Sequence, residues 1–302
     1  MNWNILLNDY LNYLKIERGL SNNSVINYEN DLKKLINYID NYQLNLSPKN
    51  INQSDIQIFI YEIAKVLHER SQARIISGLR GFFDYLIFED IRKDNPLDLI
   101  ESPKIGKKLP DTLSTEEIDE LIASIDLNKN EAERNIAIVE TLYGCGLRVS
   151  ELINLKISDL YFDEGFITVK GKGNKQRLIP IAEHTQVCIE NYLEYSRNSV
   201  KINDDFKDIV FLNRRGKQLT RAMIFTIIKD LVKKCKMSKN ISPHTFRHSF
   251  ATHLLENGAD LRAIQQMLGH ESITTTEIYM HLDRKHLANT LNSYHPRKKM
   301  QQ

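Results

Sequence analysis

Cysteine is scarce in this sequence. Only three of the 302 residues are cysteines, Cys145, Cys188 and Cys235, and no two of them form a C-x-x-C pair. Neither a zinc cluster with the usual cysteine spacing nor a disulfide framework is therefore expected. Isolated, reduced thiols are typical of a cytosolic protein.

Long apolar runs are also absent. No stretch approaches the ~20 apolar residues that a membrane-spanning helix needs. The first residues show no basic segment followed by an apolar run, which a secretory leader would have. We therefore expect a soluble, cytoplasmic protein without a membrane partner.

A large excess of one charge is lacking as well. The 41 basic and 39 acidic residues leave a formal net charge of +2, so a nucleic-acid surface must arise from local clustering. The phosphate-loop pattern G-x-x-x-x-G-K-[ST] and the zinc pattern H-E-x-x-H are both missing. His244 and His248 have the spacing of metal ligands, but Arg247 between them disfavours a cation. We expect neither a metal nor a cofactor.

A linker between two domains is predicted at residues 104–110. Prolines and a glycine in and beside this segment break any helix, and its lysines favour water. Residues 1–103 and 111–302 would then form two domains, each long enough to bury its own core. Ser114 and Glu117 form a capping-box pattern that opens the first helix of the second domain.

The expected fold class is mainly α with a small antiparallel β-sheet. Apolar residues recur at helical spacing in four stretches of the first domain, which are 5–14, 25–39, 56–67 and 75–88. These stretches predict a helical bundle. In the second domain, residues 166–169 and 177–181 are rich in β-formers and flank a Gly-Lys-Gly-Asn turn, which places Lys172 at the tip of a hairpin. Residues 209–212 are predicted as a third strand.

Two helices are expected near the C-terminus. One begins at the N-cap Asp260 and ends at Gly269, and the other ends before Pro296. The first should bury Leu261, Ile264 and Leu268, and the second should present a stripe of Leu287, Leu291 and Tyr294.

Two arginines and a histidine are placed to bind an anion. Ser242 and Pro243 predict the start of a helix. That helix would carry His244 and Arg247 three residues apart on one face. Arg148 follows a flexible Gly-Cys-Gly segment and precedes an apolar-periodic run, so it lies near another helix start. Two guanidinium groups can hold the non-bridging oxygens of a phosphodiester, although an isolated arginine more often forms a surface ion pair.

Five short motifs follow one another along the chain. They are GLRVSEL at 146–152, GKGNK at 171–175, SPHTFRH at 242–248, LGH at 268–270 and TEIY at 276–279. In this order they resemble the tyrosine site-specific recombinases. The runs FATHLL at 250–255 and GADLR at 258–262 resemble the Xer subgroup of that family, and a looser resemblance extends through the N-terminal half.

The resemblance implies a SAM-like core-binding domain followed by a mixed α+β catalytic domain. It also implies a catalytic set that works without ATP or metal, namely Arg148, Lys172, His244, Arg247, His270 and Tyr279. Lys172 would protonate the leaving 5′ oxygen, His270 would hydrogen-bond the phosphate, and Tyr279 would attack it to form a 3′-phosphotyrosyl link. A phenol with an ordinary pKa near ~10 needs nearby positive charge for this attack.

The function implied by the resemblance is site-specific recombination that resolves chromosome dimers during cell division. Expected partners are double-stranded DNA, a related recombinase subunit of the XerC type in a cyclic heterotetramer, and, as a candidate, an FtsK-like DNA translocase of the division machinery. Three alternatives stay open. They are a phage or mobile-element integrase with the same chemistry, a type IB topoisomerase-like enzyme, and a catalytically silent DNA-binding protein.

Two groups of basic residues are candidates for contacts with the DNA backbone. They are Arg70, Arg74 and Arg80 in the first domain and Arg214, Arg215, Lys217 and Arg221 in the second. For any one of them, an ordinary solvated position is the commoner explanation. Related recombinases donate the C-terminal segment to a neighbouring subunit, so we expect the tail to dock in trans, although packing against its own domain is commoner in general.

Overall fold

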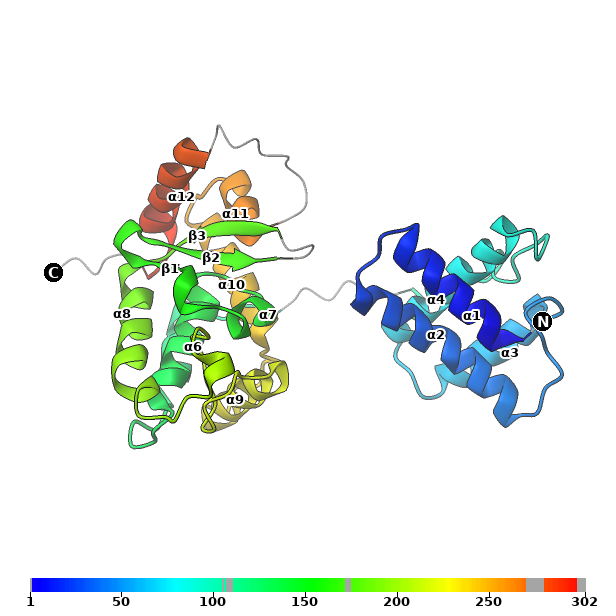
Figure 1. The fold of residues 1–302 in the computed structure, drawn as a ribbon, viewed down its shortest axis with the longest axis horizontal. Helices are drawn as coiled ribbons and strands as arrows, with labels where there is room; N and C mark the ends of the chain where they lie inside the picture. The colour runs from blue at the N-terminus through cyan, green and yellow to red at the C-terminus, as the bar shows by residue number, and fades with distance from the viewer. Residues whose placement is uncertain (1, 105, 107–110, 172–174, 270–279, 298–302) are drawn as a thin grey trace. The chain divides into compact units, whose positions relative to one another are not determined.

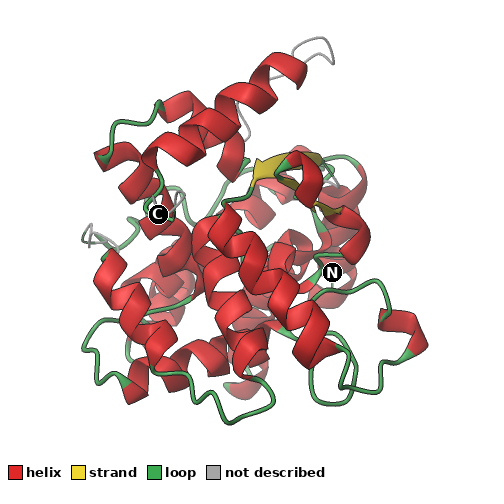
Figure 2. Cartoon of the chain, turned by 90° about the vertical axis from the view of Figure 1, so that its left-hand side faces the viewer, coloured by secondary structure: helices red, strands yellow, loops and turns green. Residues whose placement is uncertain are grey.

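The computed structural model describes residues 2–104, 106, 111–171, 175–269 and 280–297, without the side chains of 280–286 (Figure 1). The chain forms two compact units, Met1–Lys108 and Leu109–Gln302. Helices dominate the described part of both units, and the strands occupy little of the chain (Figure 2). The expected fold class, mainly helical with a small antiparallel sheet, is confirmed.

The first unit is a bundle of four helices. These are α1 (Trp3–Ile16), α2 (Asn22–Asn41), α3 (Gln53–Ala64) and α4 (Glu69–Phe88). Asn52 and Asp55 form a reciprocal capping box at the start of α3, with N···O distances of 2.9 and 3.1 Å. Apolar side chains from all four helices fill the core, and Leu32, Ile56 and Phe82 are fully buried. The four helices cover the four predicted stretches, although α3 ends before residue 67.

The second unit surrounds its sheet with helices. In chain order its elements are α5 (Thr115–Ala123), α6 (Ala132–Gly144), α7 (Val149–Ile153), β1 (Leu160–Tyr161), β2 (Phe166–Lys170), β3 (Gln176–Pro180), α8 (Glu183–Asn191), α9 (Arg221–Lys234), α10 (Pro243–Glu256), α11 (Leu261–Leu268) and α12 (Met280–Tyr294). The predicted capping box of α5 is present, since Ser114 N donates to Glu117 Oε2 at 2.7 Å and Glu117 N donates to Ser114 Oγ at 3.2 Å. Helix α6 is almost wholly buried and contacts both α8 and α10.

The sheet confirms the predicted hairpin but not the predicted third strand. Strands β2 and β3 pair in antiparallel register, with Ile167 opposite Ile179, and the edge strand next to β2 is β1. The prediction of a strand at 209–212 is wrong, because that segment makes only isolated bridges. Side chains satisfy its backbone groups instead: the Tyr192 hydroxyl accepts from Leu212 N at 3.0 Å, and Arg134 donates to Leu212 O at 3.1 Å.

Helix α11 differs from expectation at its first residue. Asp260 caps the helix as predicted, accepting from Ala263 N at 3.1 Å. Gly269 ends it in the left-handed conformation, with φ +65. Leu261, expected to be buried, is 54% exposed, because it occupies the first position of the helix and lies beyond the core that covers Ile264 and Leu268.

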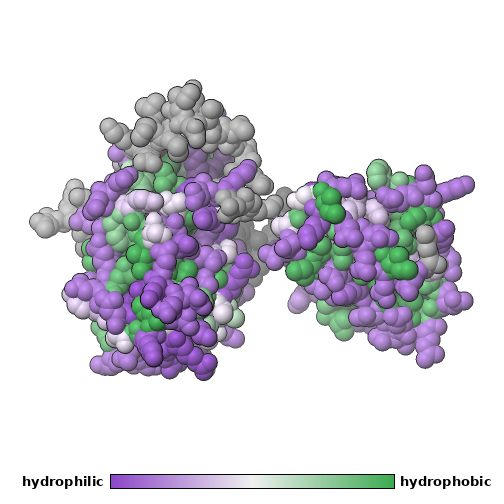
Figure 3. Space-filling model, viewed as in Figure 1, coloured by the Kyte–Doolittle hydropathy of each residue, from purple (hydrophilic) through white to green (hydrophobic). Residues whose placement is uncertain are grey.

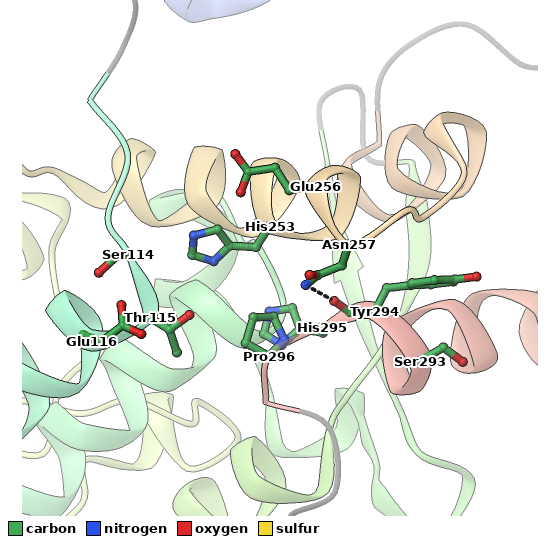
Figure 4. Close-up of a pocket in the computed structure, with 10 residues that line it drawn as sticks. All are labelled: Ser114, Thr115, Glu116, His253, Glu256, Asn257, Ser293, Tyr294, His295 and Pro296. Carbon is green, nitrogen blue, oxygen red and sulfur yellow. Dashed lines mark hydrogen bonds between the residues drawn. The ribbon is translucent and has the colours of Figure 1, made fainter.

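The C-terminal tail packs against its own domain. Leu287 and Leu291 are buried in the core of the second unit, and α12 contacts β3, α10 and α11. Asn257 donates to the Tyr294 carbonyl at 2.7 Å (Figure 4). Tyr294, the third residue of the predicted stripe, is 37% exposed. Within this single chain the two leucines pack in cis, and docking of the tail in trans stays a prediction.

The surface shows no large apolar face in the view of Figure 3. Hydrophilic side chains dominate it, and apolar residues reach it singly or in small groups, as is usual for protein surfaces. Among the helices that the structure describes, none is both long and apolar enough to cross a bilayer.

Candidate active site

Arg148 stands at the N-cap of α7 and is held by the helix it opens. Its backbone N–H donates to Glu151 Oε2 at 2.8 Å, and its Nη1 donates to Glu151 Oε1 at 2.8 Å. The left-handed Gly146, with φ +58, turns the chain just before it. A Cβ at Gly146 would lie 2.6 Å from the Phe250 ring, so only glycine fits. The side chain of Arg148 remains 33% exposed and is accessible to an anion.

Arg247 approaches the same place from α10. Its Nη1 donates to the Gly146 carbonyl at 2.8 Å, and its Nη2 donates to the Leu268 carbonyl. Burial, and then the charge of Arg148, lower the pKa of Arg247 to about 10, so the guanidinium remains charged at neutral pH. His244, one turn earlier, is exposed. The two residues share a helix, as predicted, but they lie in different environments.

One buried carboxylate connects the arginines. The Glu151 side chain is only 2% exposed, and Arg177 binds it in a bidentate manner, at 2.7 and 2.8 Å. Arg247 Nη1 lies 3.8 Å from Glu151 Oε2. Burial by itself raises the pKa of the Glu151 carboxyl, but the hydrogen bonds and charge of Arg177, with those of Arg148, outweigh burial and hold the pKa below its usual range. Three guanidinium groups therefore surround one anion and leave an excess of positive charge.

The C-terminal end of α11 is tied to all three arginines. Three successive carbonyls each accept a hydrogen bond from a different one: Met267 from Arg177 at 2.9 Å, Leu268 from Arg247, and Gly269 from Arg148 at 3.4 Å. The last carbonyls of a helix have no partner within it and carry partial negative charge, so guanidinium groups cap them well. The three arginines and the described end of α11 are thus joined by hydrogen bonds.

Half of the predicted catalytic set lies in the described residues. Lys172, His270 and Tyr279 lie outside them. Of their described neighbours, Gly269 accepts a hydrogen bond from Arg148, and Gly171 lies beside Arg177. At the neck of the β2–β3 hairpin, Gly171 N donates to the Lys175 carbonyl at 2.8 Å. A Cβ at Gly171 would lie 3.5 Å from Arg177 Nη1.

Sequence reasoning did not assign roles to Glu151 and Arg177. A signal for Glu151 was available, since an acidic residue three positions after a helix start can cap that start. A signal for Arg177 was also present, because residues two apart on a strand share a face, and Arg177 therefore lies on the same face as the buried Ile179. A charged side chain on the inner face of a strand needs a buried partner.

The candidate DNA contacts divide into engaged and exposed residues. Arg80 donates to the carbonyls of Leu97 and Ile100, at 3.3 and 2.9 Å, and so it stabilises its own domain. Arg74 pairs with the buried Asp31 at 2.6 Å, whereas Arg70 is exposed. The four candidates in the second unit, Arg214, Arg215, Lys217 and Arg221, are all exposed, and Arg214 pairs with Glu131 at 2.8 Å. In the part of the chain that the structure describes, no group of three or more His, Cys, Asp or Glu side chains could hold a metal ion.

The chain matches two protein-family models. Residues 111–286 match the phage integrase family, and residues 7–90 match the N-terminal SAM-like domain of phage integrases. Together these matches cover more than half of the sequence. The chain therefore belongs to the phage integrase family, and it is an enzyme of the tyrosine recombinase class that carries out site-specific recombination of DNA.

Individual relatives are similar over nearly their whole length. The tyrosine recombinase XerD of Oceanobacillus iheyensis is 42% identical over 294 residues, which is 96% of this chain and 98% of that protein. XerD of Listeria monocytogenes is 41% identical over 295 residues, or 97% and 99% of the two proteins.

Solved structures share the fold. XerH site-specific recombinase in a post-cleavage complex with a palindromic difH substrate has a TM-score of 0.70 and 26% identity, covering 89% of this chain and 79% of that one. A lambda integrase dimer bound to a core site has a TM-score of 0.71, covering 92% and 100% of the two chains, at 19% identity.

Proposed function

We propose that six residues form the active site for cutting and rejoining DNA, namely Arg148, Lys172, His244, Arg247, His270 and Tyr279. The observation that carries the proposal is the cluster of Arg148, Arg177 and Arg247 around the single buried carboxylate of Glu151. The uncompensated positive charge favours a phosphodiester, and it favours the more highly charged transition state even more.

The proposed reaction is a transesterification. Tyr279 loses its phenol proton to solvent, its oxygen attacks the phosphorus, the bond from phosphorus to the 5′ oxygen breaks, and a 3′-phosphotyrosyl link forms. Lys172 gives a proton to the departing 5′ oxygen. Arg148 and Arg247 stabilise the equatorial oxygens, with His244 and His270 as hydrogen-bond donors. A 5′ hydroxyl then reverses the step on the same or another strand, so neither ATP nor a metal enters the balance.

We further propose a chromosomal role for this chain. Its support is the 42% identity to a tyrosine recombinase XerD over nearly the whole length. The enzyme would resolve chromosome dimers in the cytoplasm during cell division. Its partners would be duplex DNA, a XerC-like subunit in a cyclic heterotetramer and an FtsK-like translocase. Residues 104–110 would link the DNA-binding domain 1–103 to the catalytic domain 111–302.

The chemistry is tested with a nicked duplex that traps the covalent intermediate. Wild-type protein should form an adduct that survives a denaturing gel. Tyr279→Phe should bind the same DNA and form no adduct, because only the attacking oxygen is lost. Tyr195→Phe is the matched control, since Tyr195 is 60% exposed and has no assigned role. An adduct with Tyr279→Phe would move the nucleophile to another residue.

The biological role is tested by mapping cleavage sites on the genome that encodes the protein. One chromosomal site is expected. Cleavage at the ends of a mobile element instead would assign the chain to the integrase alternative. Product strands that never join a second duplex would assign it to the topoisomerase alternative.

A further inference from the structure

Arg177 is a largely buried cation whose hydrogen bonds to described residues go to Glu151 and to the end of α11. It lies on β3 opposite Val169, and its side chain is 13% exposed. Nη1 and Nη2 donate to the two oxygens of Glu151 at 2.7 and 2.8 Å, and Nε donates to the Met267 carbonyl at 2.9 Å. A buried guanidinium with three hydrogen bonds in a fixed fork is rigidly oriented.

The contacts of Arg177 join three separate elements of the domain. Glu151 lies on α7, Met267 on α11, and Arg177 itself on the hairpin strand that follows Lys172. A Cβ at Gly269 would lie 2.9 Å from Arg177 Cδ, so the end of α11 is shaped around this side chain.

The charge balance explains why such a residue is needed. A carboxylate as buried as that of Glu151 is costly unless it is paired. Without Arg177, the cations left to pair it among the described residues are Arg148 at 2.8 Å and Arg247 at 3.8 Å. A guanidinium that neutralises a carboxylate offers less of its charge and fewer of its N–H groups to a phosphate.

We propose that Arg177 is a positioning residue of the recombination reaction. It neutralises Glu151 and fixes α7 and α11 to β3, so that Arg148 and Arg247 keep their charge and orientation for the scissile phosphate. Arg177 itself does not touch the DNA. This inference rests on the active site proposed above.

The first test is Arg177→Met, measured as the rate of adduct formation on nicked DNA at saturating DNA concentration. The rate should fall about 100-fold, the loss typical of a reacting group displaced by about 1 Å. DNA affinity should change less than about 3-fold, because most of it comes from phosphate contacts elsewhere. Arg177→Lys, which keeps the charge but not the bidentate geometry, should lose less than Arg177→Met.

The decisive test repeats both substitutions in a Glu151→Gln background. If Arg177 acts by neutralising the carboxylate, removing that carboxylate should shrink the loss from about 100-fold to less than about 10-fold, a coupling of the size seen between contacting residues. A purely structural role predicts the same loss in both backgrounds. If Arg177→Met does not fold, the loss of adduct-formation rate caused by Arg177→Lys is compared in the two backgrounds instead, and a smaller difference is expected.

The matched control is Arg197→Met. Arg197 is another buried arginine of this unit, and it donates to the carbonyls of Lys207 and Ile209 at 2.7 and 3.0 Å. Its loss should lower thermal stability without slowing adduct formation below the melting temperature. If Arg177→Met forms the adduct at the wild-type rate, or if the loss of rate is equal in the two backgrounds, the inference about Arg177 is wrong and the proposed function still stands. A wild-type chain that forms no adduct would overturn the proposed function.

Discussion

Lowering the pH from 7 to 5 should destabilise the second unit through one buried histidine. His295 is fully buried, with ring centroids 4.8 Å from Tyr143 and 5.2 Å from Phe250. Its Nδ1 accepts from the backbone N–H of Arg297 at 3.1 Å, and its Nε2 has no partner among the described residues. Figure 4 shows it between α10 and the end of α12. Burial, and then the nearby Arg297 and His253, lower the pKa of His295 to about 3.

The size of the effect follows from proton linkage. In the unfolded chain a histidine has a pKa of about 6.5, so below that pH the unfolded state binds a proton that the folded state refuses. Stability is therefore fully present above pH 6.5. It falls by about 1.4 kcal/mol per pH unit as the pH drops toward the folded pKa. Between pH 7 and 5 the loss is about 2 kcal/mol, a large part of the ~5–15 kcal/mol that stabilises a typical protein.

The assay compares wild type with His295→Gln, which removes the titration but keeps a side-chain acceptor for the Arg297 N–H. Urea unfolding followed by circular dichroism at pH 7, 6 and 5 gives the difference in free energy of unfolding. That difference should shift by about 2 kcal/mol in favour of the variant at pH 5. Trp3, the only tryptophan, lies in the first unit, so its fluorescence serves as an internal control that the substitution should not affect. A difference that stays constant from pH 7 to 5 would refute the reasoning.

Three further outcomes are expected. Hydrogen bonds to Cys188 and Glu140 raise the pKa of His184 to about 10, so raising the pH from 7 toward 10 should lower the free energy of unfolding. In urea unfolding, His184→Gln should show a smaller decline over this pH range. Leu291→Ala should lower the free energy of unfolding by about 2–5 kcal/mol in the same assay, because Leu291 is 1% exposed in the core. A much smaller loss would mean that Leu291 does not pack in the core of its own domain. Adduct formation should persist in EDTA, while DNA binding should weaken steeply with salt, and an absolute requirement for a divalent ion would contradict the proposed site.

Local signals in the sequence predicted most of the fold. Helix starts at Ser114, Ser242 and Asp260 carry their own capping residues, and the hairpin has β-formers on both sides of a glycine turn. The prediction of a strand at 209–212 was wrong because the segment is rich in β-formers but has no strand to pair with, and it makes only isolated bridges. Its backbone groups bond to Tyr192, Arg134 and neighbouring loops, which no local pattern reveals.

The tail shows a second limit of sequence reasoning. Of the predicted stripe, Leu287 and Leu291 correctly indicated a helix face that packs in an apolar groove, whereas Tyr294 is 37% exposed. A periodic pattern specifies what a helix must bury but not which chain supplies the groove. Arg297 adds to the cis contacts, since its guanidinium pairs with Asp119 and with Glu140. A chain truncated before residue 287 would therefore lose part of the domain core, including Leu287 and Leu291, as well as any contact of the tail with a neighbour.

The arginines of the site show why its motifs could be found while its architecture could not. Motifs located Arg148 and Arg247, yet spacing alone could not show that both, together with Arg177, donate to consecutive carbonyls at the end of α11. That arrangement makes the end of one helix and the anion-binding cations a single hydrogen-bonded unit. A phosphate that draws Arg148 or Arg247 away from these carbonyls would leave the end of α11 without part of its cap.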